Sequence, residues 1–357
     1  MNTVELVEYI FERKAHSFGD FLRALEASSR FKKFVEDNCD KVRKKIRNTN
    51  SNDETVKDVL AEIELAYLLL QVDRFSRVEY ECYGIEEPNP DLTVTDGKSG
   101  FAFNVEVKRI RCTDGEKRFE AWKQLVAKRV IAVPSKLALS MDIGSFDTLI
   151  DLVDHLEAKT EDIISYITET IVASEEKIPL GSEKSYSVPG LEGVFEFKLR
   201  KPPRKPTSGH TLYDGGSFPI FYTHKEYRKF GDEICDPAHL GQMRSGEVNI
   251  LAISTDSDTH DDLDFGKALD SIEEHVTQGD DGFFIKKGFK GSEDFAKQLE
   301  RLSGIFFRSV WVAVGFVPNI LWCNDKAQCS IPNDIGKILQ VMDYPRSKVS
   351  FEDFKWC

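Results

Sequence analysis

An acid and a lysine stand two residues apart in an otherwise apolar stretch, FAFNVEVKRI, at residues 101–110. Successive side chains of a strand point to opposite faces. Glu106 and Lys108 therefore share one face of the expected strand, while the Phe and Val residues can bury the other. Upstream, the turn EEPNPD places Asp91 directly after a proline. Residues 92–95 and 101–110 are expected to form a hairpin that brings Asp91 beside Glu106.

This set of side chains favours metal chemistry. Two carboxylates at bonding distance repel each other, so one stays protonated unless a cation lies between them. Hard oxygen ligands favour Mg²⁺ or Mn²⁺ over zinc, and the carbonyl of Val107 is a plausible further ligand. Such a metal activates water and neutralises charge on a phosphodiester. Lys108 would add positive charge near the scissile phosphate and help to orient or deprotonate the water.

The ordered pattern Pro90-Asp91, then Glu106-Val107-Lys108, resembles the PD-(D/E)xK signature of the restriction-endonuclease-like nuclease superfamily. The resemblance covers roughly residues 54–130, less than a quarter of the chain. It implies a mixed sheet between helices and metal-dependent cleavage of phosphodiester bonds. It also implies that the acids and the lysine of the motif are the active residues.

The resemblance further implies a glutamate on the helix that precedes the motif. Residues 54–71, ETVKDVLAEIELAYLLLQ, have the clearest helical periodicity in the chain, and they offer Glu62 and Glu64. These two flank the core-facing centre of the helix on opposite sides, about 100° from it. Glu62 lies on the more apolar side, where solvation explains an acid less well, so we prefer it as the metal ligand. Gln124 is a weaker candidate for a polar residue on the helix after the motif.

Other acid-x-Lys triplets test how specific the pattern is. The strongest rival is Glu196-Phe197-Lys198, which also lies in an expected strand. It lacks a Pro-Asp turn just upstream and a glutamate-bearing helix at short range. The alternative without catalysis is that Glu106 and Lys108 form a structural salt bridge on the exposed face of a hairpin. The order helix, strand, turn, strand and triplet favours the nuclease site.

Helices alternate with apolar strands, which predicts an α/β fold. We expect a mixed central β-sheet flanked by helices, with a restriction-endonuclease-like core and additional helical and loop-rich insertions. Residues 1–53 should form a helical segment and 54–357 the α/β domain, with the core motif at 54–130. A helical and loop-rich insertion is expected at about 146–245, with one or two helices at its start. Strands and helices at 246–345 should complete the core.

Composition limits the partners. The chain has 357 residues and a net charge of −13, which argues against a protein that coats itself in nucleic acid. Two basic runs, KVRKKIR at 41–47 and KLRKPPRK at 198–205, are either solvated surface or phosphate contacts. No apolar run is long enough to cross a membrane, and no signal peptide is evident. Seven scattered cysteines are typical of reduced thiols and predict a cytoplasmic protein.

Together these features predict a Mg²⁺-dependent (or Mn²⁺-dependent) nuclease, with DNA endonuclease as the first hypothesis. Two alternatives stay open. The chain can be a non-catalytic nucleic-acid- or protein-binding module on a nuclease fold. It can also be a nuclease subunit that requires a protein partner or a homodimer. The sequence does not choose between DNA and RNA, or between endonuclease and exonuclease action.

Overall fold

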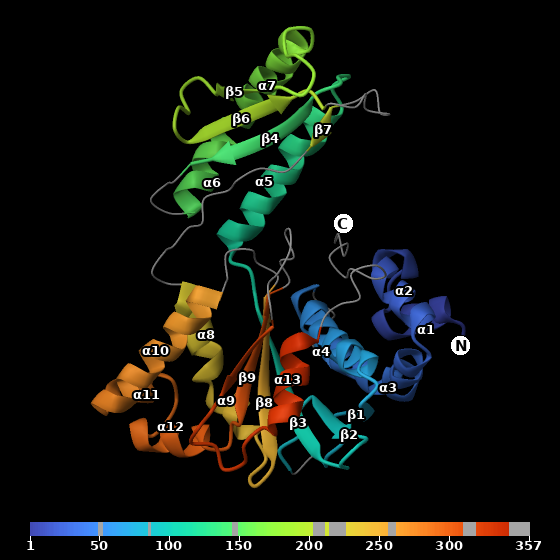
Figure 1. Cartoon of the computed structure of the whole chain (residues 1–357), viewed down its shortest axis with the longest axis vertical. Coiled ribbons are helices and arrows are strands. Elements are labelled where there is room, and N and C mark those ends of the chain that lie inside the picture. Colours follow the sequence, from blue (N-terminus) through green and yellow to red (C-terminus); the bar gives the residue numbers. More distant parts are fainter. Residues whose placement is uncertain are drawn as a thin grey trace. The chain divides into compact units, whose positions relative to one another are not determined.

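The structure, a computed structural model, describes residues 1–48, 53–84, 87–144, 149–202, 211–213, 226–255, 262–309 and 319–342. The chain divides into two compact units. The first is Met1–Arg111 with Glu226–Cys357, and the second is Cys112–Lys225. The second unit is thus inserted into the sequence of the first. In Figure 1, where the colours follow the sequence, the second unit has the green colours of the middle of the chain. It begins earlier in the sequence than the insertion expected at about 146–245.

The first unit contains a six-stranded mixed sheet. Its strands are β1 (Phe75–Tyr80), β2 (Leu92–Asp96), β3 (Ala102–Ile110), β8 (Val248–Thr255), β9 (Gly304–Ser309) and β10 (Ile320–Cys323). They lie in the order β1-β2-β3-β8-β9-β10. Neighbours β3, β8 and β9 run parallel, and the other pairs are antiparallel. The predicted hairpin is confirmed, because β2 pairs with β3 in the register Leu92 with Val105.

Helices cover both faces of this sheet, as a sheet with a parallel centre requires. On one face lie α4 (Asp53–Gln71) and α13 (Asn333–Val341). The other face is covered by α8 (Glu226–Ile234), α9 (Pro237–Gly241), α10 (Asp262–Gln278), α11 (Asp281–Lys286) and α12 (Ser292–Leu299). The alternation of β3 decides which residue enters which core: Val105 and Val107 pack toward α4, and Ile110 toward α8. Burying each of these side chains contributes about 1.5–3 kcal/mol. The predicted α/β class with a mixed, helix-flanked sheet is confirmed at this level.

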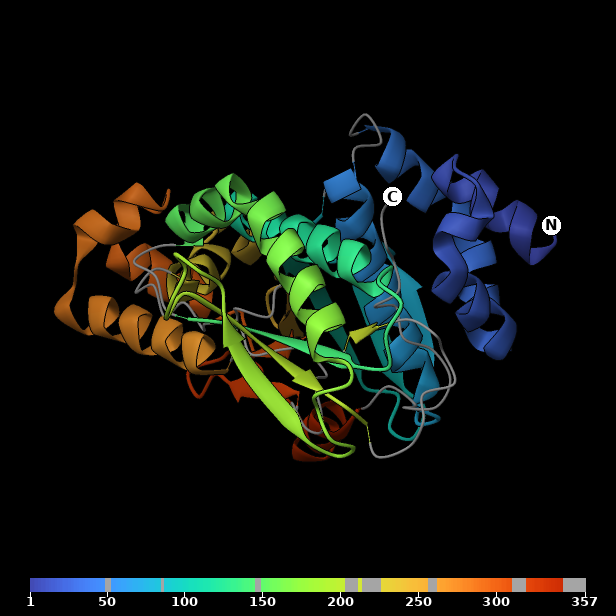
Figure 2. The same cartoon turned by 90° about the horizontal axis from the view of Figure 1, so that it is seen from above.

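The N-terminal helices belong to the core of the first unit. They are α1 (Thr3–Phe11), the 3₁₀ turn η1 (Ala15–Phe18), α2 (Gly19–Ala27) and α3 (Ser29–Asn48). Phe31 packs edge-on against Tyr67 of α4, with ring centroids 4.9 Å apart, and Phe34 packs against Tyr80 of β1. Figure 2 shows these helices (blue) gathered at one end of the first unit. Residues 1–48 therefore pack as part of the α/β core in the first unit.

The second unit has its own sheet and core. Its elements are α5 (Asp114–Ile131), β4 (Ala138–Ile143), α6 (Leu149–Ala158), α7 (Thr160–Ser174), β5 (Glu183–Ser187), β6 (Phe195–Arg200) and β7 (Leu212–Tyr213). The strands lie in the order β5-β6-β4-β7. Trp122 of α5 packs edge-on against Phe195 of β6 at 5.8 Å. Where one or two helices were expected within 146–176, the structure has two, α6 and α7.

The strands and helices expected at 246–345 include β8 and the helix α12 that leads into β9. Residues 310–318 lie outside the described part of the chain. Over the described residues, none of the helices combines the length and the apolar character that crossing a membrane requires.

Candidate active site

Helix α4 carries Glu62 into the interior of the first unit. The helix is buried along most of its length, with Val59, Ile63 and Ala66 in the core. Glu62 is only 5% exposed. Its Oε2 accepts a hydrogen bond of 2.6 Å from the hydroxyl of Tyr80, which lies at the end of β1. An acid this deeply buried requires partners, because an unpaired buried charge is strongly unfavourable.

Asp91 lies just before β2 and is buried as well. One carboxylate oxygen, Oδ2, accepts a hydrogen bond of 2.8 Å from the backbone amide of Val107 on β3. The backbone carbonyl of Asp91 accepts from the amide of Glu81 at 3.0 Å. Continuing the β2–β3 register by one step sets Asp91 opposite Glu106. The hairpin thus fixes Asp91 against the strand that carries the acid-x-Lys triplet.

Glu106 and Lys108 form an ion pair on β3, with 2.8 Å between Oε1 and Nζ. Glu106 is 5% exposed, so the pair does not lie on an exposed hairpin face, as a purely structural surface salt bridge would. Burial, together with the Asp91 carboxylate, raises the pKa of Glu106 to about 7 in spite of Lys108. Burial disfavours the charged form of Lys108, but the Glu106 and Asp91 carboxylates outweigh it and raise the pKa of Lys108. Lys108 is therefore a cation at neutral pH.

A second lysine, Lys45 of α3, lies between three acids. Its Nζ is 2.9 Å from Glu62 Oε2, 3.0 Å from Glu81 Oε1 and 3.0 Å from Asp91 Oδ1. Burial opposes its charge, yet the Asp91 and Glu62 carboxylates outweigh burial and raise the pKa of Lys45. Burial and the Asp91 charge raise the pKa of Glu62 to about 8, although Lys45 and Tyr80 act in the opposite direction.

The carboxylate oxygens of this cluster are chemically suited to a divalent cation. Glu62, Glu81 and Asp91 turn carboxylate oxygens toward one cationic nitrogen, and Glu106 adds a fourth buried acid. Hard oxygen donors of this kind are those that Mg²⁺ prefers, at about 2.0–2.1 Å. Within the described ranges, no group of three or more acid, His or Cys side chains converges closely enough to hold a metal. Around Lys45, three carboxylate oxygens lie 2.9–3.0 Å from the ammonium nitrogen, which is a hydrogen-bond distance and longer than a Mg²⁺–oxygen contact.

A cleft of about 500 Å³ opens beside these residues at the end of β3. Glu62 lines it from α4, and Val107, Lys108 and further residues line it from β3. Its other wall comes from α8 and α9 and includes Glu233 and His239. Burial raises the pKa of Glu233 to about 7, although Lys108 acts against this. Burial and Lys108 lower the pKa of His239.

An acidic stripe on α4 fixes the end of β3. Glu54, Asp58 and Glu62 recur every four residues and so share one helix face. Arg109 pairs with Asp58 at 3.0 Å and with Glu54 at 2.6 Å, and Arg111 pairs with Asp58 at 2.5 Å. Both arginines line the cleft. These pairs hold Lys108 and its neighbours in a defined place against α4.

Several sequence-predicted residues lie elsewhere. Glu64 of α4 pairs with Arg308 of β9 at 3.0 Å, whereas Glu62 meets Asp91 through Lys45. Gln124 lies on α5, which belongs to the second unit. In the first unit, the helix that next follows the motif is α8. The rival triplet lies on β6, where Lys198 pairs with Asp142 at 2.7 Å.

Most of the basic run at 41–47 is used inside the first unit. Lys41 donates to the carbonyls of Tyr80 and Glu81, at 2.9 Å and 3.0 Å. Arg43 and Arg47 both pair with Glu12. These contacts give Lys41, Arg43 and Arg47 partners within the first unit, and phosphate contact by this run stays a prediction. In the second run, Lys201 donates to the carbonyl of Glu175, and residues 204 and 205 lie outside the described part of the chain.

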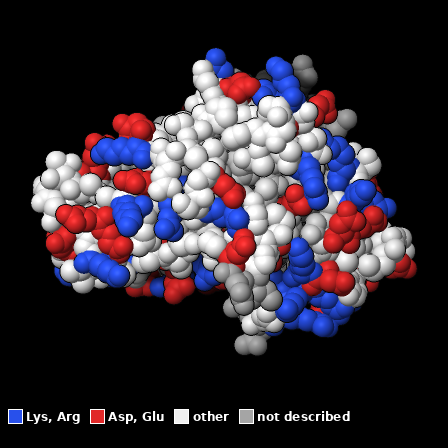
Figure 3. All heavy atoms as spheres, turned by 90° about the horizontal axis from the view of Figure 1, so that it is seen from below, with Lys and Arg blue, Asp and Glu red and all other residues white. Residues whose placement is uncertain are grey.

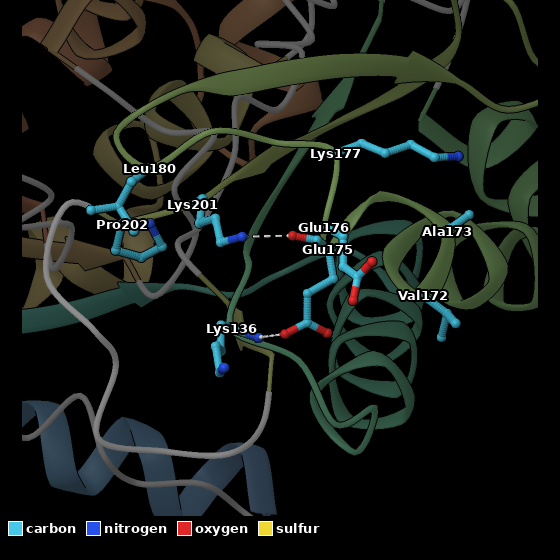
Figure 4. Close-up of a pocket in the computed structure, with 9 residues that line it drawn as sticks. All are labelled: Lys136, Val172, Ala173, Glu175, Glu176, Lys177, Leu180, Lys201 and Pro202. Atoms are coloured by element: carbon cyan, nitrogen blue, oxygen red, sulfur yellow. Dashed lines mark hydrogen bonds between the residues drawn. The ribbon is translucent and has the colours of Figure 1, made fainter.

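The second unit has a cleft of about 470 Å³, drawn in Figure 4. Two hydrogen bonds join its lining residues: Lys201 Nζ donates to the carbonyl of Glu175 at 2.7 Å, and the amide of Lys136 donates to the Glu175 carboxylate at 3.1 Å. Lys177 points away from this pair. These bonds involve Glu175, and the residues lining the cleft do not form a cluster of buried acids like that of the first unit.

Sequence reasoning missed four residues of the site: Lys45, Glu81, Glu233 and His239. The basic run at 41–47 offered cations for the predicted acids, but nothing in the run singled out Lys45. For Glu81 a backbone signal exists only in the structure, because its φ of 42° is in the left-handed region that non-glycine residues rarely adopt. Glu233 and His239 return to the site only after the insertion.

Comparison with known proteins yields no matching family model, no matching curated protein and no matching solved structure. Over its described residues, the face drawn in Figure 3 has no large basic patch that would by itself indicate a nucleic-acid-binding surface. Figure 3 shows lysine and arginine side chains interspersed with acidic ones over the face seen from below. The functional argument therefore depends on the acid and lysine cluster itself.

Proposed function

We propose that this protein is a Mg²⁺- or Mn²⁺-dependent nuclease that hydrolyses phosphodiester bonds, with DNA as its substrate. The observation that carries the proposal is a set of three buried acids, Glu62, Asp91 and Glu106, each 5–6% exposed. Lys45 links Glu62 to Asp91, Lys108 pairs with Glu106, and Glu62 and Lys108 line a cleft. Burying three acids within one cluster is strongly unfavourable unless cations compensate them. Ionisable groups with perturbed pKa values beside a cleft are typical of functional sites, which favours a chemical role.

The residues divide the work by position. Glu62, Asp91 and Glu106, with the carbonyl of Val107, would hold the metal. When bound, the metal would supply an activated water and neutralise charge on the phosphate. The backbone amide of Val107 also orients Asp91, because it donates a hydrogen bond of 2.8 Å to the Asp91 carboxylate. Because the pKa of Lys108 is raised, Lys108 acts as a charged group that stabilises the phosphate and orients the water, and a role in deprotonating the water is disfavoured.

Glu106 would be ionised when it holds a metal, because ligating carboxylates are deprotonated. Proton transfer therefore falls to Glu233 on the facing wall of the cleft, whose pKa is raised to about 7. A group that exchanges protons works best when its pKa is near the working pH. Arg111, which is half exposed at the cleft, and Lys229 supply positive charge for the phosphates on either side of the reacting one.

The wider fold supports this reading. The segment α4-β1-β2-β3, followed after the insertion by α8 and β8, forms a mixed sheet between helices. Such a core is what the resemblance to the PD-(D/E)xK superfamily implies. Asp91 and the triplet lie on adjacent strands of one hairpin, and Glu62 on the helix that packs against them.

One observation favours a second candidate, a non-cutting nucleic-acid- or protein-binding module. The cluster is already compensated within the chain, because Lys45 meets three acids and Lys108 meets Glu106. A retired active site would keep such pairs for stability alone. In that case, replacing Lys108 would change stability but no reaction.

The test is a cleavage assay on supercoiled plasmid, single-stranded DNA and RNA, with Mg²⁺, Mn²⁺ or EDTA. The proposal expects metal-dependent cutting of DNA that is lost in Glu106→Gln. Glu196→Gln, in the rival triplet, is the matched control and should cut like the wild type. Folded protein that cuts no substrate with either metal would contradict an autonomous nuclease. Cutting of RNA alone would change the substrate class.

A further inference from the structure

The nitrogen of Lys45 is at the centre of the acid cluster. It lies within 3.0 Å of Glu62, Glu81 and Asp91, which approach from α4, the end of β1 and the start of β2. Two of these acids are assigned to the metal under the proposed function. A divalent cation and an ammonium group cannot share the same oxygens, because they repel and because a metal draws its ligands about 1 Å closer.

We propose that Lys45 is a built-in competitor of the divalent cation, and that metal binding requires its ammonium to leave Glu62 and Asp91 and to pair with Glu81 alone. The inference rests on the proposed metal site. Helix α3 would thus control the metal affinity of the site through the side chain of Lys45. In the metal-free protein Lys45 keeps the acids together, and in the metal-bound protein Glu81 holds Lys45 aside.

The surroundings of the three acids support this direction of movement. The side chains of Glu62 and Asp91 are 7% and 8% exposed, whereas those of Glu81 and Lys45 are 27% and 32% exposed. Glu81 therefore lies on the solvent side of the cluster, where a flexible lysine can follow. Its φ of 42° is a strained conformation for a residue with a side chain, and such strain is typical of sites where position matters.

Helix α3 is anchored independently of Lys45. Lys41, one turn earlier on the same helix, donates to the carbonyls of Tyr80 and Glu81. Val42 and Ile46 flank Lys45 and are buried in the core. The helix can thus stay in place while the Lys45 side chain moves, so the competition requires only a change of side-chain conformation.

The experiment titrates the full chain with Mn²⁺ alone, without nucleic acid, by calorimetry at about pH 8.5, where more of the carboxyl groups are ionised. Lys45→Met should lower the apparent Kd by about ten-fold or more, because the metal no longer has to bind a minor conformation. Lys44→Met removes the same charge from an exposed site on the same helix and should change the Kd by less than about two-fold. Lys45→Gln serves as a second variant should Lys45→Met fold poorly.

Glu81 has an opposite and separate expectation. In Glu81→Gln the displaced lysine lacks its partner, so Mn²⁺ should bind several-fold more weakly. In the double variant Lys45→Met/Glu81→Gln the affinity should equal that of Lys45→Met. An equal loss in both backgrounds would make Glu81 a direct ligand and overturn its role as the partner of the displaced lysine.

The outcomes separate this inference from the proposed function. Folded Lys45 variants that bind Mn²⁺ no more tightly than the wild type would overturn the competition, while the metal site itself would stand. If neither the wild type nor any Lys45 variant binds Mn²⁺, the metal site is absent, and both the competition and the metal-dependent nuclease are contradicted.

Discussion

The carboxylate of Asp91 accepts a hydrogen bond from the backbone amide of Val107, with 2.8 Å between Oδ2 and N. The bond joins the residue that follows Pro90 to the middle of the acid-x-Lys triplet. It uses one oxygen of Asp91 to hold the hairpin and leaves the other, Oδ1, 3.0 Å from Lys45. Asp91 therefore has a structural and a chemical role that experiments can separate.

Substituting Asp91 should affect stability and cutting differently. In Asp91→Ala the buried amide of Val107 loses its acceptor, which should lower the free energy of unfolding by about 1–3 kcal/mol. Asp91→Asn keeps an acceptor oxygen and should be less destabilised, yet it loses the charge that holds a cation, so both variants should stop cutting. Urea denaturation in EDTA and a plasmid assay measure the two effects. Equal destabilisation by both substitutions would argue against a stabilising role for the hydrogen bond from the Val107 amide to Asp91.

The two glutamates of α4 should separate cleanly. Glu62→Gln removes a ligand from the acid cluster and should reduce the cutting rate by about 10²-fold or more. Glu64→Gln weakens the pair with Arg308 on β9, which does not involve Lys45 or Lys108, and should leave the rate within about three-fold of the wild type. The measurement is the initial rate of plasmid nicking in Mg²⁺. A large loss in Glu64→Gln with an active Glu62→Gln would reverse the assignment.

The local parts of the fold were predictable from sequence. Helix α4, the β2–β3 hairpin and the buried strand β8 each depend on a periodicity that extends over fewer than 20 residues. The order of Asp91, Glu106 and Lys108 in the hairpin followed from the same local signals. The preference for Glu62 came from its apolar surroundings on α4, and the structure buries this residue beside Tyr80.

The long-range parts were not predictable in the same way. Lys45 and Asp91 are 46 residues apart, and a basic amphipathic helix gives no sign of which lysine turns inward. The insertion begins directly after β3, so the helix that follows the motif in sequence, α5, belongs to the second unit. Its Gln124 was chosen on sequence order, whereas α8, more than 100 residues later, is the helix that lines the cleft.

Stability in EDTA should fall as the pH rises through neutrality. The pKa values of Glu62 and Glu106 are raised to about 8 and about 7, so the native state binds more protons than the unfolded state above about pH 4.5. The contribution of these protons is fully present near pH 4.5 and is lost as the pH approaches 8, by up to about 1.4 kcal/mol per pH unit for each group. Chemical denaturation across this window measures the slope. Glu62→Gln should flatten it, and an unchanged slope in that variant would contradict the raised pKa of Glu62.

Lys45 and Glu62 should be energetically coupled when metal is absent. Lys45→Met leaves buried carboxylates without their cation and should destabilise the chain by about 1–3 kcal/mol, a range reduced for the partial exposure of the lysine. Glu62→Gln in the same chain removes one of the carboxylates, so the double variant should be more stable than the sum of the single effects. A double-mutant cycle in EDTA measures this coupling. Additive effects would show that the two residues do not share the cluster.

The central claim, that the buried acids and Lys108 form a working nuclease site, has one most direct test. Nicking of supercoiled plasmid is followed in Mg²⁺ for the wild type, Lys108→Ala and Lys98→Ala. Lys98 is the matched control: it belongs to another acid-x-Lys triplet, Asp96-Gly97-Lys98, and lies in the exposed turn after β2. The account predicts cutting by the wild type and Lys98→Ala, prevented by EDTA, and a loss of about 10²-fold or more in Lys108→Ala. Cutting that survives in folded Lys108→Ala at the wild-type rate would contradict it.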